Sequence, residues 1–138
     1  MTANGPVFGE IAVRPPGGHY MELLERAYGF DPWKTYVSVE CDQAPPKLPS
    51  QARLFAAVYM IHPGEGQVVS ISGSDEVSKF PSVFEYSMDL IVGENVADHV
   101  NTSNEVGRVL LAAKTSEEVL AQIEFIERNL KIVLAKTG

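Results

Sequence analysis

The sequence predicts an α+β domain in which a mostly antiparallel sheet has helices packed on one side. Two observations support this class: apolar runs of strand character recur between Pro- and Gly-rich turns, and helix-start signals occur near both ends of the chain. The length of 138 residues and hydrophobic content of 45% suit one modest domain with a buried core. We therefore expect a single domain over residues 1–138.

The first expected strand is polar on one face and ends in a tight turn. Side chains alternate along a strand, so Glu10, Ala12 and Arg14 share a face. Pro15-Pro16 cannot donate to a sheet ladder, and Gly17-Gly18 permits turn conformations that other residues resist. The carboxylate and guanidinium suit a metal and phosphate site, or else a surface ion pair contributing about 0–1 kcal/mol.

Two helices and a loop are expected next. Apolar residues recur at helical spacing over residues 19–29, and Gly29 is a C-terminal stop. Asp31 is an N-cap candidate, followed by Pro32 at the first helical position, where its missing N–H is no loss. Residues 42–51 contain three prolines and predict an extended loop.

A hairpin is predicted in the middle of the chain. Residues 52–62 form an apolar strand candidate, residues 63–66 (PGEG) a strong turn, and residues 67–73 the hairpin partner. A short helix over residues 74–79 follows, capped by Ser74 or Asp75. Two further strands are expected, at residues 83–93 and 108–114.

The connection over residues 94–107 is polar and predicted to be irregular. Its part at residues 101–107 is either an ordinary surface loop or a loop that reaches a ligand at the open side of the sheet.

The last predicted element is a helix. Thr115 and Glu118 match a capping box. An apolar stripe then recurs at spacings of three and four residues, which favours one core-packing helix over a coiled coil. The stripe consists of Val119, Ile123, Ile126, Leu130 and Val133.

The segment around Glu10 and Arg14 resembles the last metal-binding motif of the ATP-grasp superfamily of carboxylate–amine ligases, Glu-x-Asn-x-Arg on a strand. In the amino-acid ligase branch a Pro/Gly turn and a helix follow, as here. The resemblance extends over nearly all 138 residues. It implies that Glu10 is the Mg²⁺-bridging carboxylate and that Arg14 contacts the transferred phosphate or acyl phosphate. Ala12 stands where many members have a metal-ligating asparagine, and a methyl group cannot coordinate Mg²⁺.

The resemblance also implies ATP and Mg²⁺ as cofactors, with Gly17 and Gly18 as the cofactor-binding turn. In the family the nucleotide-binding half precedes this motif. We therefore expect a C-terminal fragment or stand-alone remnant of such a ligase, which by itself binds neither cofactor and is inactive. A homodimer, or a companion chain supplying the nucleotide-binding half, is the expected partner.

Two other classes stay open: a non-enzymatic binding or oligomerisation module, and a small domain that holds an anion with Arg14, the Gly17-Gly18 turn and the following helix N-terminus.

Composition excludes several further functions. A net charge of −7, with only 11 scattered Lys and Arg, argues against nucleic-acid binding. No apolar run approaches the roughly 20 residues of a membrane helix. The single cysteine, Cys41, allows no intrachain disulfide and fits a cytoplasmic protein. The histidines His19, His62 and His99 are scattered and are interpreted as structural or surface residues.

Overall fold

The computed structural model describes residues 14–97 and 105–135. Glu10, Ala12 and His99, and most of the connection at residues 101–107, lie outside the described residues. The described elements, in chain order, are α1 (Tyr20–Tyr28), α2 (Pro32–Glu40), β1 (Phe55–Met60), β2 (Gly66–Ser72), α3 (Ser74–Ser78), β3 (Val83–Met88), β4 (Asn95–Val96), β5 (Gly107–Ala113), α4 (Ser116–Asn129) and β6 (Lys131–Ala135).

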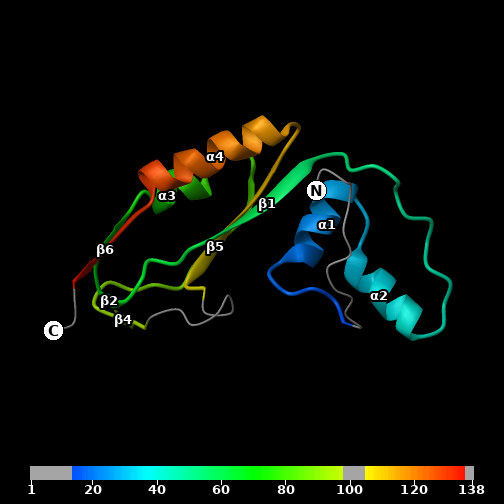
Figure 1. Cartoon of the computed structure of the whole chain (residues 1–138), viewed down its shortest axis with the longest axis horizontal. Helices are drawn as coiled ribbons and strands as arrows, with labels where there is room; N and C mark the ends of the chain where they lie inside the picture. The colour runs from blue at the N-terminus through cyan, green and yellow to red at the C-terminus, as the bar shows by residue number, and fades with distance from the viewer. Residues whose placement is uncertain (1–13, 98–104, 136–138) are drawn as a thin grey trace, which may run out of the picture.

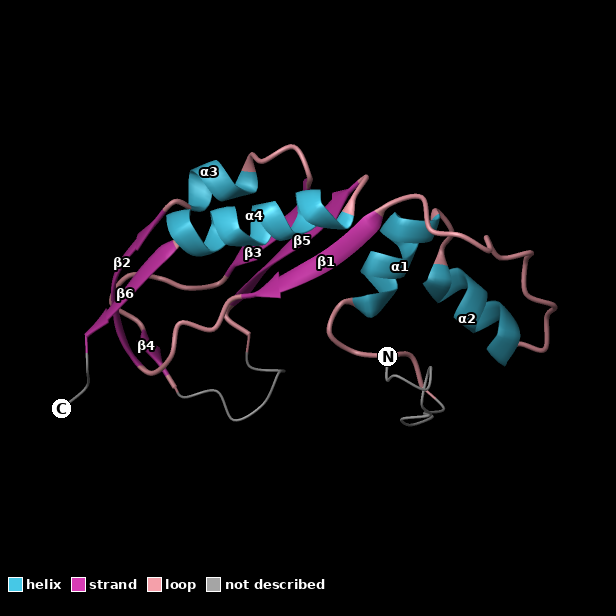
Figure 2. Cartoon of the chain, turned by 45° about the horizontal axis from the view of Figure 1, so that its top comes forward, coloured by secondary structure: helices cyan, strands magenta, loops and turns pink. Residues whose placement is uncertain are grey.

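The strands form two three-stranded antiparallel sheets, ordered β1-β5-β3 and β4-β2-β6. Figure 1 shows α1 and α2 at one end of the molecule and the β4-β2-β6 sheet at the other. Helices α3 and α4 lie together over the strands (Figure 2). The predicted α+β class with antiparallel pairing is confirmed.

Strand β5 forms the centre of the larger sheet. Val109 and Leu111 are fully buried against Val77 of α3 and Ile126 of α4. Leu110, equally buried, points to the opposite face because strand side chains alternate. Helix α1 contacts β1 and β5 and reaches across to β3. The structure thus adds a helix on the second face to the predicted covering of one side.

The local signals for the first two helices are confirmed. Gly29 adopts a left-handed conformation (φ 74°) after α1, and its N–H donates to the Glu25 carbonyl. The Asp31 carboxylate accepts a hydrogen bond of 2.8 Å from the Lys34 N–H, and Pro32 is the first residue of α2. The Pro-rich segment at residues 42–51 contains no helix or strand, as predicted.

The predicted hairpin between residues 52–62 and 67–73 is wrong. Strand β1 pairs with β5, whereas β2 pairs with β4 and β6. Gly64 and Gly66, with φ values of 95° and 144°, turn the chain out of one sheet and into the other. The apolar β5 requires a partner on both edges as well as cover on both faces, and β1 supplies one of those edges.

The last helix is shorter than predicted. Its capping box between Thr115 and Glu118 is present, but the helix ends at Asn129 and Leu130 is extended (φ −73°, ψ 111°). Val133 therefore belongs to β6 and is half-exposed, not part of a buried helical stripe. The apolar residues within 130–134 fit either helical or strand periodicity. Hydrogen-bonded pairing with β2 selects the strand.

Two smaller predictions also need correction. Helix α3 begins after Gly73, which has a left-handed backbone (φ 82°), and neither Ser74 nor Asp75 caps it. The strand expected at residues 83–93 ends at Met88, and the short strand β4 occurs in the connection predicted to be irregular.

We predict that Gly73→Ala destabilises the fold far more than Gly64→Ala. Both glycines have positive φ, but a Cβ at Gly73 would overlap the carbonyl of Asn129, whereas one at Gly64 meets nothing within 4 Å. We expect losses of about 3 kcal/mol or more and about 1 kcal/mol, respectively, in the free energy of unfolding measured with urea. Equal losses would mean that the close approach of Gly73 to Asn129, at the end of α4, does not contribute to stability.

Candidate functional site

The connection that enters α1 contains three of the four predicted site residues. Arg14 is exposed, and its Nη1 donates to the Pro15 carbonyl at 3.1 Å. Gly17 is exposed and a Cβ there would meet nothing within 4 Å, while Gly18 has a left-handed backbone (φ 67°) close to Met60 of β1. This connection therefore offers one guanidinium and an open glycine turn at the start of a helix.

His19, directly after the turn, is the N-cap of α1 and also has a left-handed backbone (φ 65°, ψ 17°). For a residue with a Cβ this conformation costs on the order of 1–3 kcal/mol. Its side chain makes no cap hydrogen bond to the helix. The ring Nε2 instead lies 2.7 Å from Oε1 of Glu105.

A group of four side chains, which we call the His19 cluster, continues from this pair: His19, Glu105, Arg108 and Glu85. Arg108 Nη1 lies 3.5 Å from the same Glu105 oxygen. Its Nε donates a hydrogen bond to Glu85 Oε1 at 2.8 Å, and its Nη2 forms an ion pair with the same oxygen at 2.8 Å. The cluster joins the entrance of α1 to strands β5 and β3.

The cluster is partly shielded from solvent, with side-chain exposures of 23% for His19, 17% for Glu105, 27% for Arg108 and 37% for Glu85. Burial disfavours the charged form and acts to lower the pKa of Arg108. The hydrogen bond to Glu85, with the negative charges of Glu85, Glu105 and Asp89, outweighs burial and raises the pKa of Arg108 overall. Arg108 is therefore a permanent positive charge at the centre of the cluster.

An acidic groove lies between α1 and β3. Its lining includes the carboxylates of Glu22, Glu25, Asp31 and Glu85. The guanidinium in its lining, that of Arg26, is already engaged, because it stacks over the ring of Phe84 at 5.1 Å. Such a groove repels phosphate, so an anion is better placed at the Arg14 connection than here.

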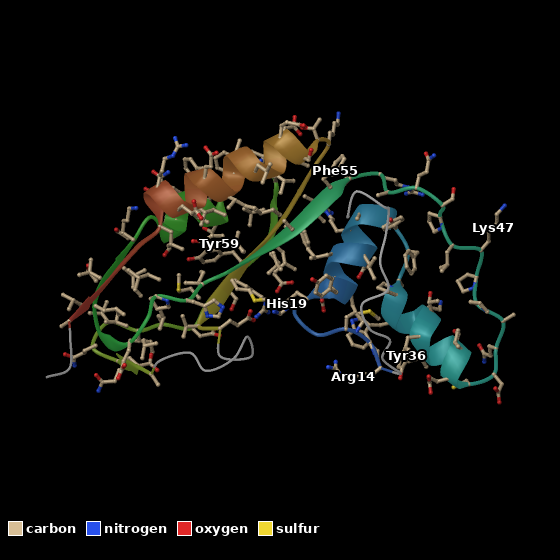
Figure 3. All side chains as sticks on the ribbon, in the orientation of Figure 1. Arg14, His19, Tyr36, Lys47, Phe55 and Tyr59 are labelled. Carbon is tan, nitrogen blue, oxygen red and sulfur yellow. The ribbon has the colours of Figure 1, made fainter. Side chains whose placement is uncertain are left out.

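Arg14 and His19 both belong to the connection that enters α1, but their side chains lie in different places. Figure 3 shows His19 on the side of the strands and Arg14 below the two helices. Glu10, the predicted metal ligand, lies outside the described residues. The site roles of Arg14, Gly17 and Gly18 therefore stay predictions. Gly17 and Gly18 directly precede the start of α1, as expected, whereas Arg14 lies in a bend and not on the predicted strand.

Sequence reasoning does not find the His19 cluster. It interprets His19 as a structural or surface residue, and it gives Glu85, Glu105 and Arg108 no role beyond their strands and loop. One signal is nevertheless present: Glu85 and Arg108 are charged residues inside otherwise apolar strand segments, VFEYSM and GRVLLAA. Charges in such positions are seldom left without partners.

Within residues 14–97 and 105–135, no group of three His, Cys, Asp or Glu side chains is arranged to hold a metal ion. Glu105 is bonded to His19 and Arg108, and Glu85 to Arg108. The carboxylates of the His19 cluster are therefore engaged with cations of the protein itself. In the part of the chain that the structure describes, no helix has the length and apolar character needed to cross a membrane.

The fold matches that of the C-terminal part of ATP-grasp ligases. Two solved structures have the same fold. The L-amino acid ligase from Bacillus licheniformis matches with a TM-score of 0.71 and 17% identity over 86% of this chain. The phosphoribosylglycinamide synthetase from Anaerococcus prevotii matches with a TM-score of 0.64 and 18% identity over 85%.

The family is shown by the sequence itself. The chain belongs to the family L-amino acid ligase C-terminal domain 2, whose sequence model matches residues 58–135, more than half of the chain. The chain spans 30% of the length of each of the two structures named above. No functionally curated protein matches it.

We predict that Arg108→Met destabilises the protein by about 2 kcal/mol, because Glu85 and Glu105 would be left partly buried without their cation. Arg128 provides a matched control, since its ion pair with Glu124 is exposed on α4 and Arg128→Met is expected to cost no more than about 0.5 kcal/mol. Thermal and urea unfolding measure both. Equal effects of the two substitutions would show that the cluster contributes no more than a surface pair.

Proposed function

We propose that this chain is the C-terminal region of an ATP-dependent ligase that joins an amino acid carboxylate to an amine through an acyl phosphate. Family membership over residues 58–135 is the observation that carries this proposal. One structural relative is an L-amino acid ligase, which supports amino acids as the substrate class. In this reaction the carboxylate takes a phosphoryl group from ATP, the amine nitrogen attacks the carbonyl carbon, and the C–O bond breaks as phosphate leaves.

The contribution of the described residues is to hold the phosphate. Arg14 is exposed, and a guanidinium pairs with phosphate oxygens through two parallel N–H donors. Gly17 leaves room for the backbone to approach a ligand. The first N–H groups of α1 lack a side-chain cap, and amides at a helix start attract anions. These groups would stabilise the charge on the leaving phosphate.

The nucleotide is expected to be bound elsewhere. The chain covers 30% of the length of each structural relative, so most of either fold lies outside it. ATP and Mg²⁺ are the cofactors of the class, but we assign no step to Mg²⁺ because Glu10, its expected ligand, lies outside the described residues. We propose that the 138-residue chain by itself does not turn over ATP.

We predict that the chain binds a stable aminoacyl phosphonate through Arg14 and releases no ADP from ATP. In an NMR titration, Arg14→Ala should weaken binding about 10- to 100-fold, the loss expected for a charge-assisted hydrogen-bonded contact. Arg128→Ala, which removes an exposed arginine paired with Glu124, is the matched control and should bind normally. A coupled ADP assay measures turnover.

Three results would contradict these expectations. Unchanged phosphonate binding by Arg14→Ala would remove Arg14 from the site, and steady ADP release above blank would contradict inactivity of the chain alone. Equal affinity for sulfate, inorganic phosphate and the phosphonate would favour the small anion-binding domain over the ligase.

A second candidate function, an association module, is favoured by the surface of α2. Pro32 is its one buried residue, while Trp33, Val37 and Val39 are 48%, 56% and 48% exposed. Trp33 and Val37 are four residues apart and so share one face of α2, and exposed apolar side chains gathered on one face favour a protein contact. The partner would be a second copy or a companion chain that supplies the nucleotide-binding half.

We predict that the chain self-associates at high concentration and that Trp33→Ser with Val37→Ser abolishes this. Leu120→Ser is the matched control, because Leu120 is 60% exposed but lies on α4, away from α2. Sedimentation velocity over a concentration series measures the association. A compact monomer at the highest concentration would refute self-association, and an equal effect of Leu120→Ser would refute the assignment to α2.

A further inference from the structure

The backbone at His19 needs an explanation that the helix does not supply. His19 and Gly18 are consecutive residues with left-handed backbones (φ 65° and 67°). Glycine adopts this conformation readily, whereas histidine does so at a cost. As an N-cap, His19 makes no side-chain hydrogen bond to α1. The contact that explains this side chain must therefore lie outside the helix.

That contact is with Glu105, 86 residues further along the chain, at 2.7 Å. Glu105 is 17% exposed and is also 3.5 Å from Arg108, so its carboxylate is held from a second direction. Arg108 in turn donates a hydrogen bond to Glu85 of β3 and forms an ion pair with it. The His19 ring is thus tied through charged contacts to the central and edge strands of the larger sheet.

The remaining neighbour of the turn is apolar and adaptable. A Cβ at Gly18 would lie 3.3 Å from the terminal methyl of Met60, a flexible side chain on β1. A Cβ at Gly17 would meet nothing within 4 Å. Among the described contacts of residues 17–19, the His19–Glu105 hydrogen bond is the one that joins a side chain to a carboxylate.

We propose that His19 is a positioning residue that orients the Gly17-Gly18 turn and the first amides of α1 for an anion, through its bond to Glu105. The identity of that anion as an acyl phosphate rests on the proposed function. His19 acts on the ligand through the backbone and is not itself required to touch it. Because Glu105 is held by Arg108, strand β5 sets the position of the turn.

Three substitutions of His19 separate the side-chain bond from the backbone requirement. His19→Gly relieves the left-handed backbone but removes the bond, and His19→Asn also tolerates this backbone but is too short to reach Glu105. His19→Gln carries an amide N–H at about the reach of Nε2 and can restore the bond. A purely conformational role predicts that Gly and Asn are best tolerated, whereas a positioning role predicts rescue by Gln.

The experiment is hydrogen–deuterium exchange of the full chain, followed by mass spectrometry of peptides covering residues 17–24. We expect His19→Gly and His19→Asn to exchange about 10-fold faster than the parent protein in this region, with His19→Gln close to the parent. Phosphonate affinity should fall about 10-fold in the first two variants and recover in the third. Glu105→Ala tests the same bond from the other side and should match His19→Gly.

Unchanged exchange in both His19→Gly and Glu105→Ala would overturn the proposal, as would His19→Gln behaving like His19→Gly. The exchange measurement needs no ligand, so a failure of the proposed function is seen separately. If the parent protein binds no phosphonate while exchange still depends on the His19–Glu105 bond, the ligase assignment fails and the positioning of the turn stands.

Discussion

The structure depends on burying strand β5 from all sides. Val109, Leu110 and Leu111 are each 0% exposed, which requires apolar cover on both faces of the sheet and a paired strand on both edges. Removing a leucine from such a position typically costs about 2–5 kcal/mol, so few arrangements of the other elements are compatible with a stable fold. Helices α3 and α4 cover one face, α1 covers the other, and β1 and β3 occupy the edges.

The position of the His19 cluster follows from this constraint. Arg108 lies on β5 immediately before the buried run, on the same face as Leu110, where α1 packs. A guanidinium so close to the core requires negatively charged partners. Glu85 of β3 and Glu105, just before β5, provide them. His19 then links this charged group to the turn that begins α1. The central strand thereby connects the core to the candidate anion site.

The start of α1 and its later turns have opposite electrostatic character. Its start presents amides without a side-chain cap after a glycine turn, which favours an anion. Its later turns, with Asp31 and Glu85, line an acidic groove. A phosphate would therefore be directed to the start of the helix by attraction there and repulsion nearby.

The sequence by itself determined the features that depend on neighbouring residues: the capping box at Thr115, the start of α2 at Asp31 and Pro32, and the end of α1 at Gly29. Each follows from backbone conformations and hydrogen bonds within one helical turn, which residue type controls directly. The family resemblance and the α+β class were also readable at this level.

Only the tertiary structure decided which strands pair, that residues 131–135 form a strand, and that His19 meets Glu105. Residues 130–134 fit a helix or a strand equally well by periodicity, and the partner β2 decided between them. The His19–Glu105 contact joins residues 86 positions apart. Local signals carry no information about such pairs, because the energy that selects them arises from burying β5 and satisfying the charges beside it.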